Sequence, residues 1–372
     1  MDAVYAIASD IGGGGIGNIA YHEAKALDRN DQLQTLYATL NSSELTVDTP
    51  LYGYLLEKAC VPFEPFGRPD FGYAIKNKLF DRYVAGQLTN PDVFVGWAGQ
   101  CLSSLRVANR MGATTFVVRA SSHALVQKRL VEAEYHKHGI DKPLAHPWHI
   151  YMNIAEYEEA DYILIPSDFV EQSFIDMGFD REQLVKIPFG VDTDAFRPAE
   201  SQETFRAIFV GQVSLRKGIQ YLLPAWANLD RDDAELLVVG PVRSNAEFLR
   251  EQYADDDSIR FLGRRSDVPE LMQSSSVFVF PSIEEGSALV TYEAMASGLP
   301  QISTVNAGSW ITDGEEGYIV PVKNVDVITK RLRDLYDNPE QAAAMGKNAR
   351  EAAYDFTWDR HKHEFVETCE EY

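Results

Sequence analysis

Short apolar runs separated by longer stretches of helical pattern recur along the 372-residue chain. In the first half these runs fall at residues 4–8, 36–38, 93–95, 115–118 and 162–165. They do not alternate between apolar and polar positions, and such continuous runs are typical of strands in a parallel sheet that helices cover on both faces. The first half is therefore predicted to be an α/β unit.

The second half repeats this alternation. Its apolar runs fall at residues 207–211, 236–240, 277–281 and 301–303. Between the halves, residues 186–198 carry prolines and a glycine, and polar residues follow up to position 204, which is typical of a linker. Because a domain has roughly 150 residues, the length also fits two domains. We expect an N-terminal Rossmann-like domain over residues 1–190 and a C-terminal one over residues 191–355.

Charge narrows the choice of partners. The chain has 34 basic and 56 acidic residues and a formal net charge of −22. Binding to nucleic acid needs a cationic surface, so a nucleic-acid partner is not expected and any phosphate site must be local. The acidity also suggests a salt-adapted host, a hypothesis that rests on composition alone.

Several features favour a cytoplasmic protein. No apolar run approaches the ~20 residues that a membrane-spanning helix needs. No basic segment precedes the first apolar run, so we expect no signal peptide. The cysteines, Cys60, Cys101 and Cys369, are odd in number and widely spaced, without metal or redox spacing.

The segment 281–300 carries the sharpest pattern. A strand is predicted to end at Pro281, and a helix to begin near Leu289 and stop at Gly298, with a proline shortly after. This places a helix N-terminus at the carboxyl end of a strand, where ligands bind in open α/β sheets. The amides of residues 286–289 are therefore candidates to hold a diphosphate.

Glu285 and Glu293 flank this loop. A carboxylate repels a diphosphate, so we expect them to accept hydrogen bonds from hydroxyls of the sugar and the ribose on either side of it. A simpler interpretation stays open, in which Glu293 only stabilises the first turn of its helix and Glu285 is a solvated charge. A second loop at an equivalent strand end, residues 211–218, favours the first interpretation, because Arg216 and Lys217 there are suited to neutralising a leaving phosphate.

With these motifs in place, the chain resembles the retaining GT-B glycosyltransferases of family 4, also called glycosyl transferases group 1. Their signature is a glutamate, seven residues and a second glutamate, the spacing of Glu285 and Glu293. Other segments that carry the resemblance are residues 160–167 with Phe169, 190–198, 209–211, 216–218, 261–263, 293–296 and 298–300. The resemblance covers nearly the whole chain. It implies two Rossmann-like domains facing each other across a cleft, with residues 356–372 crossing back to the N-terminal domain.

The resemblance also implies roles. Glu285 would contact the donor sugar and Glu293 the ribose, while Arg216 and Lys217 would bind the diphosphate. His123, which follows an N-domain strand, would lie near the donor sugar. The remaining donor-binding candidates are Gly13, Gly14, Gly263, Arg264, Gly286, Ser287, Ala288 and Leu289.

The activity so implied is sugar transfer from a nucleoside diphosphate sugar to a hydroxyl acceptor, a glycan, a lipid-linked or a small molecule. Donor binding belongs to the C-terminal domain and acceptor binding mainly to the N-terminal one. UDP or GDP is the expected nucleotide, with no separate cofactor and no metal. Two departures matter: Gln212 stands where the family often has a cation, and Ser287-Ala288 replaces an aromatic-glycine pair. The identity of the sugar is therefore not carried over.

Some of the same motifs also fit other functions. Gly12, Gly14 and Gly17 follow a strand and precede a helix, as in NAD-dependent dehydrogenases. A dehydrogenase should carry an acidic residue at the end of its next strand, but that segment, 38–43, has none. A GT-B epimerase or phosphorylase, and then a non-catalytic nucleotide-sugar binder, are the nearer alternatives.

Two further patterns concern metal binding and membrane contact. The triplets at 192–194 and 230–232 spell Asp-x-Asp, which metal-dependent glycosyltransferases use, but one lies in the expected linker and the other in a polar loop. Residues 73–84 are locally basic and aromatic, which suits either contact with the inner face of a membrane or a solvated helix whose aromatics pack on the N-terminal domain.

Overall fold

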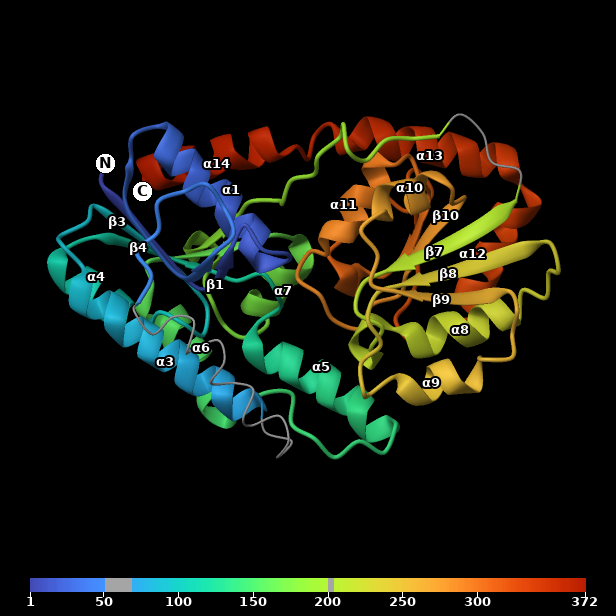
Figure 1. Cartoon of the computed structure of the whole chain (residues 1–372), viewed down its shortest axis with the longest axis horizontal. Helices are drawn as coiled ribbons and strands as arrows, with labels where there is room; N and C mark the ends of the chain where they lie inside the picture. The colour runs from blue at the N-terminus through green and yellow to red at the C-terminus, as the bar shows by residue number, and fades with distance from the viewer. Residues whose placement is uncertain (51–68, 200–203) are drawn as a thin grey trace.

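The computed structural model describes residues 1–50, 69–199 and 204–372. Within these ranges the strands form two sheets, and every pairing between strands is parallel. Figure 1 shows the two sheets in separate halves of the molecule, each covered by helices. The predicted α/β class with two Rossmann-like domains is confirmed.

The first sheet has the strand order β2-β1-β3-β4-β5-β6. Its strands are β1 (Ala3–Ile11), β2 (Leu33–Asn41), β3 (Val93–Trp97), β4 (Thr114–Val118), β5 (Tyr162–Ile165) and β6 (Leu184–Lys186). The accompanying helices are α1 (Ile16–Arg29), α3 (Pro69–Gln87), α4 (Leu102–Met111), α5 (Ala124–Lys137), α6 (Pro147–Glu159) and α7 (Asp168–Ile175), with the 3-10 turn η2 (Arg181–Gln183).

The second sheet has the strand order β12-β11-β10-β7-β8-β9. Its strands are β7 (Phe205–Val210), β8 (Ala234–Val239), β9 (Ile259–Gly263), β10 (Val277–Phe280), β11 (Gln301–Ser303) and β12 (Gly317–Ile319). The remaining helices are α8 (Ile219–Ala227), α9 (Glu247–Gln252), α10 (Val268–Gln273), α11 (Leu289–Ala296), α12 (Val325–Asp337), α13 (Pro339–Ala353) and α14 (Trp358–Glu371), with the 3-10 turns η3 (Leu215–Lys217) and η4 (Val305–Ala307).

Both strand orders contain a point where the direction of winding reverses. In the first sheet this point lies between β1 and β3, and in the second it lies between β7 and β10. Loops that leave the carboxyl ends of such a strand pair diverge to opposite faces of the sheet, which opens a crevice for a ligand. The loops after β7 and β10 are those that contain the predicted cations and the predicted glutamate pair.

The last helix, α14, returns to the first half of the molecule, where it lies beside α1 (Figure 1). Phe365 on α14 is fully buried and packs edge-on against Tyr5 of β1, with ring centroids 6.4 Å apart. The backbone N–H of Val191 donates to the carbonyl of Phe356 at 2.8 Å, so the chain crosses between the halves twice along one side.

On the opposite side of the molecule, helix α5 packs against the second half. Its sequence position belongs to the first half, but Leu130 and Tyr135 pack against the hydrophobic core of the second half. Figure 1 shows α5 reaching from the first half toward α8 and α9. The two halves are therefore in contact both at the chain crossings and at α5.

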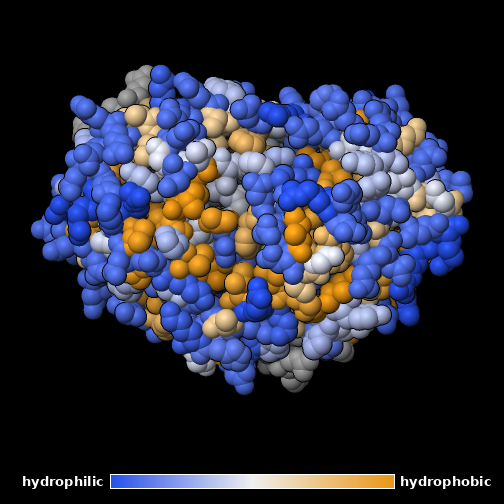
Figure 2. Space-filling model, turned by 180° about the vertical axis from the view of Figure 1, so that it is seen from behind, coloured by the Kyte–Doolittle hydropathy of each residue, from blue (hydrophilic) through white to orange (hydrophobic). Residues whose placement is uncertain are grey.

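Seen from behind, apolar residues gather across the middle of the molecule, over the junction of the two halves, and polar residues cover its ends (Figure 2). None of the helices in the described ranges is long and apolar enough to cross a membrane.

Candidate active site

The loops after β7 and β10 meet at the switch point of the second sheet. Arg216 and Lys217, on η3, both form ion pairs with Glu285, and the distance from Lys217 Nζ to Glu285 Oε1 is 2.5 Å. Gly218 follows with a φ of +77°, and a Cβ at this position would overlap the carbonyl of Pro281. Glycine is thus required for the close approach that brings the cations to the glutamate.

The electrostatics of this cluster are those of a partly buried ion triad. Burial raises the pKa of Glu285, but the charges of Arg216 and Lys217 outweigh it and lower this pKa below its usual value. Burial lowers the pKa of Lys217, and the Glu285 charge opposes that shift without reversing it. The Lys217 ammonium also lies over the ring of Phe280, 4.9 Å from its centroid. An incoming diphosphate would compete with Glu285 for these two cations.

Glu293 has a very different environment. It lies on α11, and its carboxylate makes no hydrogen bond or ion pair with any residue of the described ranges. Burial raises its pKa to about 7. Glu293 is half-buried. A partly desolvated carboxyl without a partner is unfavourable for stability, and such groups are concentrated at binding sites.

The loop between these glutamates is held tightly. A Cβ at Gly286 would overlap the carbonyl of Ala120 in the first half, and the Gly286 carbonyl accepts a 2.5 Å hydrogen bond from Ser167 Oγ. The Ser287 hydroxyl is 2.7 Å from that of Tyr292 and also contacts a backbone carbonyl. This serine is therefore occupied by internal contacts.

Helix α11 begins at Leu289, as the sequence predicts. Its N-cap, Ala288, has no side chain that can accept from the first amides of the helix. The Ala288 N–H, one of the amides predicted to hold the diphosphate, instead donates to the Ala307 carbonyl at 3.2 Å. The N–H groups of Leu289 and Val290 in the first turn favour an anion.

The glycine loop lies at the switch point of the first sheet. Gly13 N–H donates to the Asp10 carbonyl at 3.1 Å, while Gly14 is exposed. Asp10 Oδ2 accepts from Ser42 Oγ at 2.7 Å, and Asp10 Oδ1 is buried without a hydrogen-bond partner among the described residues. The structure does not bring Gly13 and Gly14 into hydrogen-bond contact with the described part of the second half, so their role at the donor stays a prediction.

Gly263 and Arg264 lie at the end of β9. Gly263 has a φ of +64° and its carbonyl accepts from Gly240 N–H at 2.8 Å. Arg264 is exposed. In the strand order β10-β7-β8-β9, this position lies at the edge of the sheet, on the β7 side of the switch point. Binding of the donor by Gly263 and Arg264 stays a prediction.

His123 is placed differently from the other candidates. It caps the start of α5, where its Nδ1 accepts from Leu125 N–H at 3.3 Å, and it is 2% exposed. Its ring packs among Tyr157, Phe174 and Phe179. Burial, followed by the charge of Arg119, lowers its pKa to about 4.

These contacts give His123 a structural role as a neutral cap. None of its contacts among the described residues reaches Glu285, Arg216 or Lys217, so a contact with the donor sugar stays a prediction.

Sequence reasoning missed Glu284. This residue is fully buried, and its carboxylate binds Ser122 and Gln127 of the first half. Two adjacent glutamates in a loop give no sequence signal that the first points into the other domain while the second faces the cations.

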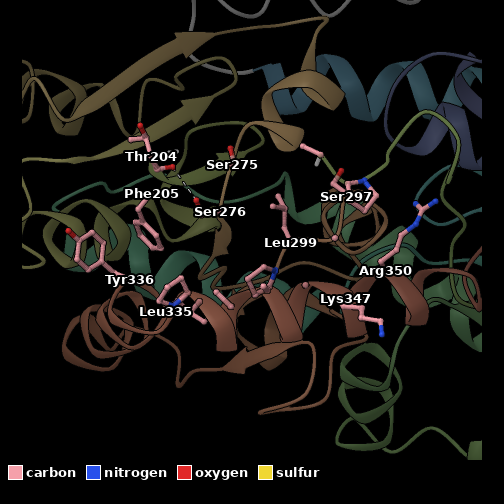
Figure 3. Close-up of a pocket in the computed structure, with 18 residues that line it drawn as sticks. Thr204, Phe205, Ser275, Ser276, Ser297, Leu299, Leu335, Tyr336, Lys347 and Arg350 are labelled. Carbon is pink, nitrogen blue, oxygen red and sulfur yellow. Dashed lines mark hydrogen bonds between the residues drawn. The ribbon is translucent and has the colours of Figure 1, made fainter. Parts of the chain in front are cut away.

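A cavity of about 580 Å³ lies elsewhere. Figure 3 shows it between the beginning of β7, around Thr204 and Phe205, and the helices that carry Tyr336, Lys347 and Arg350. Its lining residues lie at the amino end of the second sheet and include none from the loops around Glu285. It is therefore not the candidate site.

The two facing Rossmann-like domains, with paired loops at the switch point of the second, are those of the GT-B class of enzymes. The chain belongs to the glycosyl transferases group 1: the model of that family matches residues 191–352, and the model of Glycosyltransferase Family 4 matches residues 13–195. The protein is therefore a glycosyltransferase.

Individual relatives of known name support this family assignment. The chain is 30% identical to an MMP alpha-(1->4)-mannosyltransferase of Mycolicibacterium hassiacum, over 74% of this chain and 70% of the relative. Other curated relatives are matched over about half of their own length.

Among solved structures, HepE of Anabaena in complex with UDP and glucose is 16% identical with a TM-score of 0.71, over 100% of both chains. The sucrose-phosphate synthase of Thermosynechococcus elongatus is 18% identical with a TM-score of 0.72, over 100% of this chain and 99% of the other. At these identities the structures support the fold alone.

Proposed function

We propose that this glycosyltransferase moves a sugar from a nucleoside diphosphate sugar to a hydroxyl acceptor, with retention of anomeric configuration and without a metal ion. The observation that carries the proposal is the convergence of Arg216 and Lys217 on Glu285 at the β7/β10 switch point. Two cations at a strand end, next to an uncapped helix start, suit a diphosphate.

The chemistry follows from the leaving group. A nucleoside diphosphate leaves as a stable anion, so the protein needs positive charge at the phosphates more than a general acid. In the proposed step the bond from the anomeric carbon to the phosphate oxygen breaks, and a bond to the acceptor oxygen forms on the same face. The acceptor proton passes to the departing phosphate. Arg216, Lys217 and the first amides of α11 would stabilise the charge that develops there.

The glutamates would fix the donor on either side of the diphosphate. Glu293 has no partner among the described residues and would accept hydrogen bonds from the ribose hydroxyls. Glu285 would exchange its ion pairs for hydroxyls of the sugar when the diphosphate takes over the two cations. The acceptor would be a hydroxyl of a glycan, a lipid-linked or a small molecule.

UDP is the first nucleotide to test, with GDP second. The structural relative HepE binds UDP and glucose, and a 30% identical relative is a mannosyltransferase. Neither fixes the sugar for this chain, because the loop residues Ser287 and Ala288 depart from the family pattern.

The test is a panel of UDP-, GDP- and ADP-sugars, each offered with hydroxyl acceptors, with release of nucleoside diphosphate as the first readout and NMR of the product as the second. We expect one donor to be turned over and the product to keep the anomeric configuration of the donor. Turnover that is unchanged in excess EDTA supports metal independence. Release from no donor, or epimerised donor without transfer, contradicts the proposal.

A further inference from the structure

Glu284 belongs to the second domain, but its fully buried carboxylate contacts residues of the first domain. Its Oε1 accepts hydrogen bonds from Ser122 N–H at 3.1 Å and from Ser122 Oγ at 2.8 Å. Its Oε2 accepts from Gln127 Nε2 at 3.0 Å. A buried charge is tolerated only when its oxygens are paired, and here most of the pairing comes from the opposite domain.

Glu284 also contacts Arg216, one of the two cations that are predicted to bind the diphosphate. Arg216 Nη1 donates to the backbone carbonyl of Glu284 at 3.0 Å and lies 3.4 Å from Glu284 Oε2. The backbone N–H of Ile283 also donates to the Arg216 carbonyl at 2.9 Å. The position of the guanidinium therefore depends on the position of Glu284.

The part of the first domain that Glu284 binds is itself fixed. The Arg119 guanidinium donates to the carbonyls of Ser121 and Ser122, to Gln127 Oε1 and to Asn153 Oδ1. Ser122 is fully buried. A continuous set of hydrogen bonds thus runs from Arg119 through Gln127 and Glu284 to Arg216.

From these contacts we infer that Glu284 is a positioning residue, which holds Arg216 over the diphosphate while the two domains are docked. The inference rests on the proposed function, because it assigns Arg216 to the leaving phosphate. Docking of the acceptor domain and stabilisation of the leaving group are then coupled through one carboxylate. Donor cleavage would be favoured when the acceptor domain is in place and water is excluded.

A second buried carboxylate provides a matched control. Glu134, on α5, is also fully buried and also joins the domains: it accepts from Tyr221 OH at 2.6 Å and from Gln220 Nε2 at 3.0 Å, and pairs with Lys323 at 2.7 Å. It makes no hydrogen bond or ion pair with Arg216 in the described structure. Its loss weakens the same interface without touching the cation.

The test compares Glu284→Gln with Glu134→Gln. In Glu284→Gln we expect the kcat of transfer to fall at least tenfold while the KM for the donor changes less than threefold, because the interaction acts on the leaving group. The ratio of donor hydrolysis to transfer should rise at least fivefold. In Glu134→Gln that ratio should stay at the wild-type value, even if the melting temperature falls as much. Equal ratios in the two variants would overturn the inference.

A milder variant guards against misfolding. Ser122→Ala removes one hydrogen bond to Glu284 from the side of the first domain and leaves residues 211–218 unchanged. We expect amide hydrogen exchange of residues 215–217 to rise at least threefold in this variant. Unchanged exchange there would overturn the inference.

This second readout does not need turnover. If the wild type transfers no sugar from any donor, the proposed function fails, while the exchange data still decide whether Glu284 links the first domain to the loop of Arg216.

Discussion

The glutamates of the candidate site show how strongly position decides the chemistry of one residue type. Glu285 is paired with two cations, which lower its pKa despite burial. Glu293 is half-buried and has no such partner among the described residues, and its desolvation raises its pKa to about 7. One is therefore a carboxylate throughout the physiological range, and the other changes charge within it.

Replacing Glu293 by glutamine should stabilise the free protein above pH 7. The folded-state pKa of about 7 lies above the usual 4.5, so this group favours folding in acid, and its contribution is lost as pH rises through about 7. At 1.36 kcal/mol per pH unit, the difference amounts to as much as roughly 3 kcal/mol at pH 8. Urea unfolding at pH 5 and pH 8 measures it.

The same substitution should weaken donor binding at least tenfold at pH 8, because the amide cannot accept hydrogen bonds with both of its polar atoms. Calorimetric titration with the donor's nucleotide measures this. Wild-type affinity in Glu293→Gln contradicts the proposed contact of Glu293 with the ribose. A variant less stable than the wild type at pH 8 contradicts the unpaired environment of its carboxylate.

Removing the Arg216 side chain should affect the chemical step. We expect Arg216→Ala to lower the kcat of transfer by roughly 100- to 1000-fold, the scale seen when one group that stabilises transition-state charge is lost. Arg250→Ala provides the control, since Arg250 pairs with Glu247 on the surface of α9. Steady-state kinetics that do not distinguish the two variants would refute the role of Arg216.

At the scale of elements, the candidate site depends on how closely its loops approach. Gly286 lies against the carbonyl of Ala120, and any Cβ there must push the β10–α11 loop away from the first domain. We expect Gly286→Ala to reduce transfer more than tenfold. It should also lower the free energy of unfolding by roughly 1 to 3 kcal/mol, as overpacking does.

Gly86→Ala is the matched control. Gly86 lies on the exposed side of α3 with open space around it, so alanine should be neutral or stabilise the helix by roughly 0.5–1 kcal/mol. If kinetics and unfolding curves show that Gly286→Ala is as well tolerated as Gly86→Ala, the close approach of the loops is not required.

Most of the strands, and the start of α11, were predictable from the pattern of apolar residues. Each predicted apolar run lies in or overlaps a strand, and α11 begins at Leu289 as expected. The strands β6, β9 and β12 were not predicted. Two of them have three residues, and β9 is only partly buried, so neither length nor hydrophobicity marks them.

At the scale of the whole molecule, the sequence predicted the domains better than their contacts. The family motif placed Glu285, Arg216 and Lys217 in one site because its spacing is local to two loops. Glu284 and Ser122 are 162 residues apart, and only the docking of the domains pairs them. His123 matched the family by position, but the local sequence gives no sign of the aromatic side chains from later segments that enclose it.

Net charge also acts on the whole molecule. With a formal charge of −22, repulsion between acidic groups opposes the compact state. Screening shortens from about 10 Å at 0.1 M salt to about 3 Å at 1 M. The melting temperature should therefore rise between these concentrations, and calorimetry at both measures it. A fall would show that screened ion pairs matter more than screened repulsion.

A crystal structure of the protein with the nucleotide of its preferred donor would show whether a nucleoside diphosphate sugar binds at the β7/β10 switch point. We expect the diphosphate in contact with Arg216 and Lys217 and the ribose hydroxyls in contact with Glu293. A nucleotide bound at the glycine loop of the first domain, with Glu285 still paired to both cations, would contradict it.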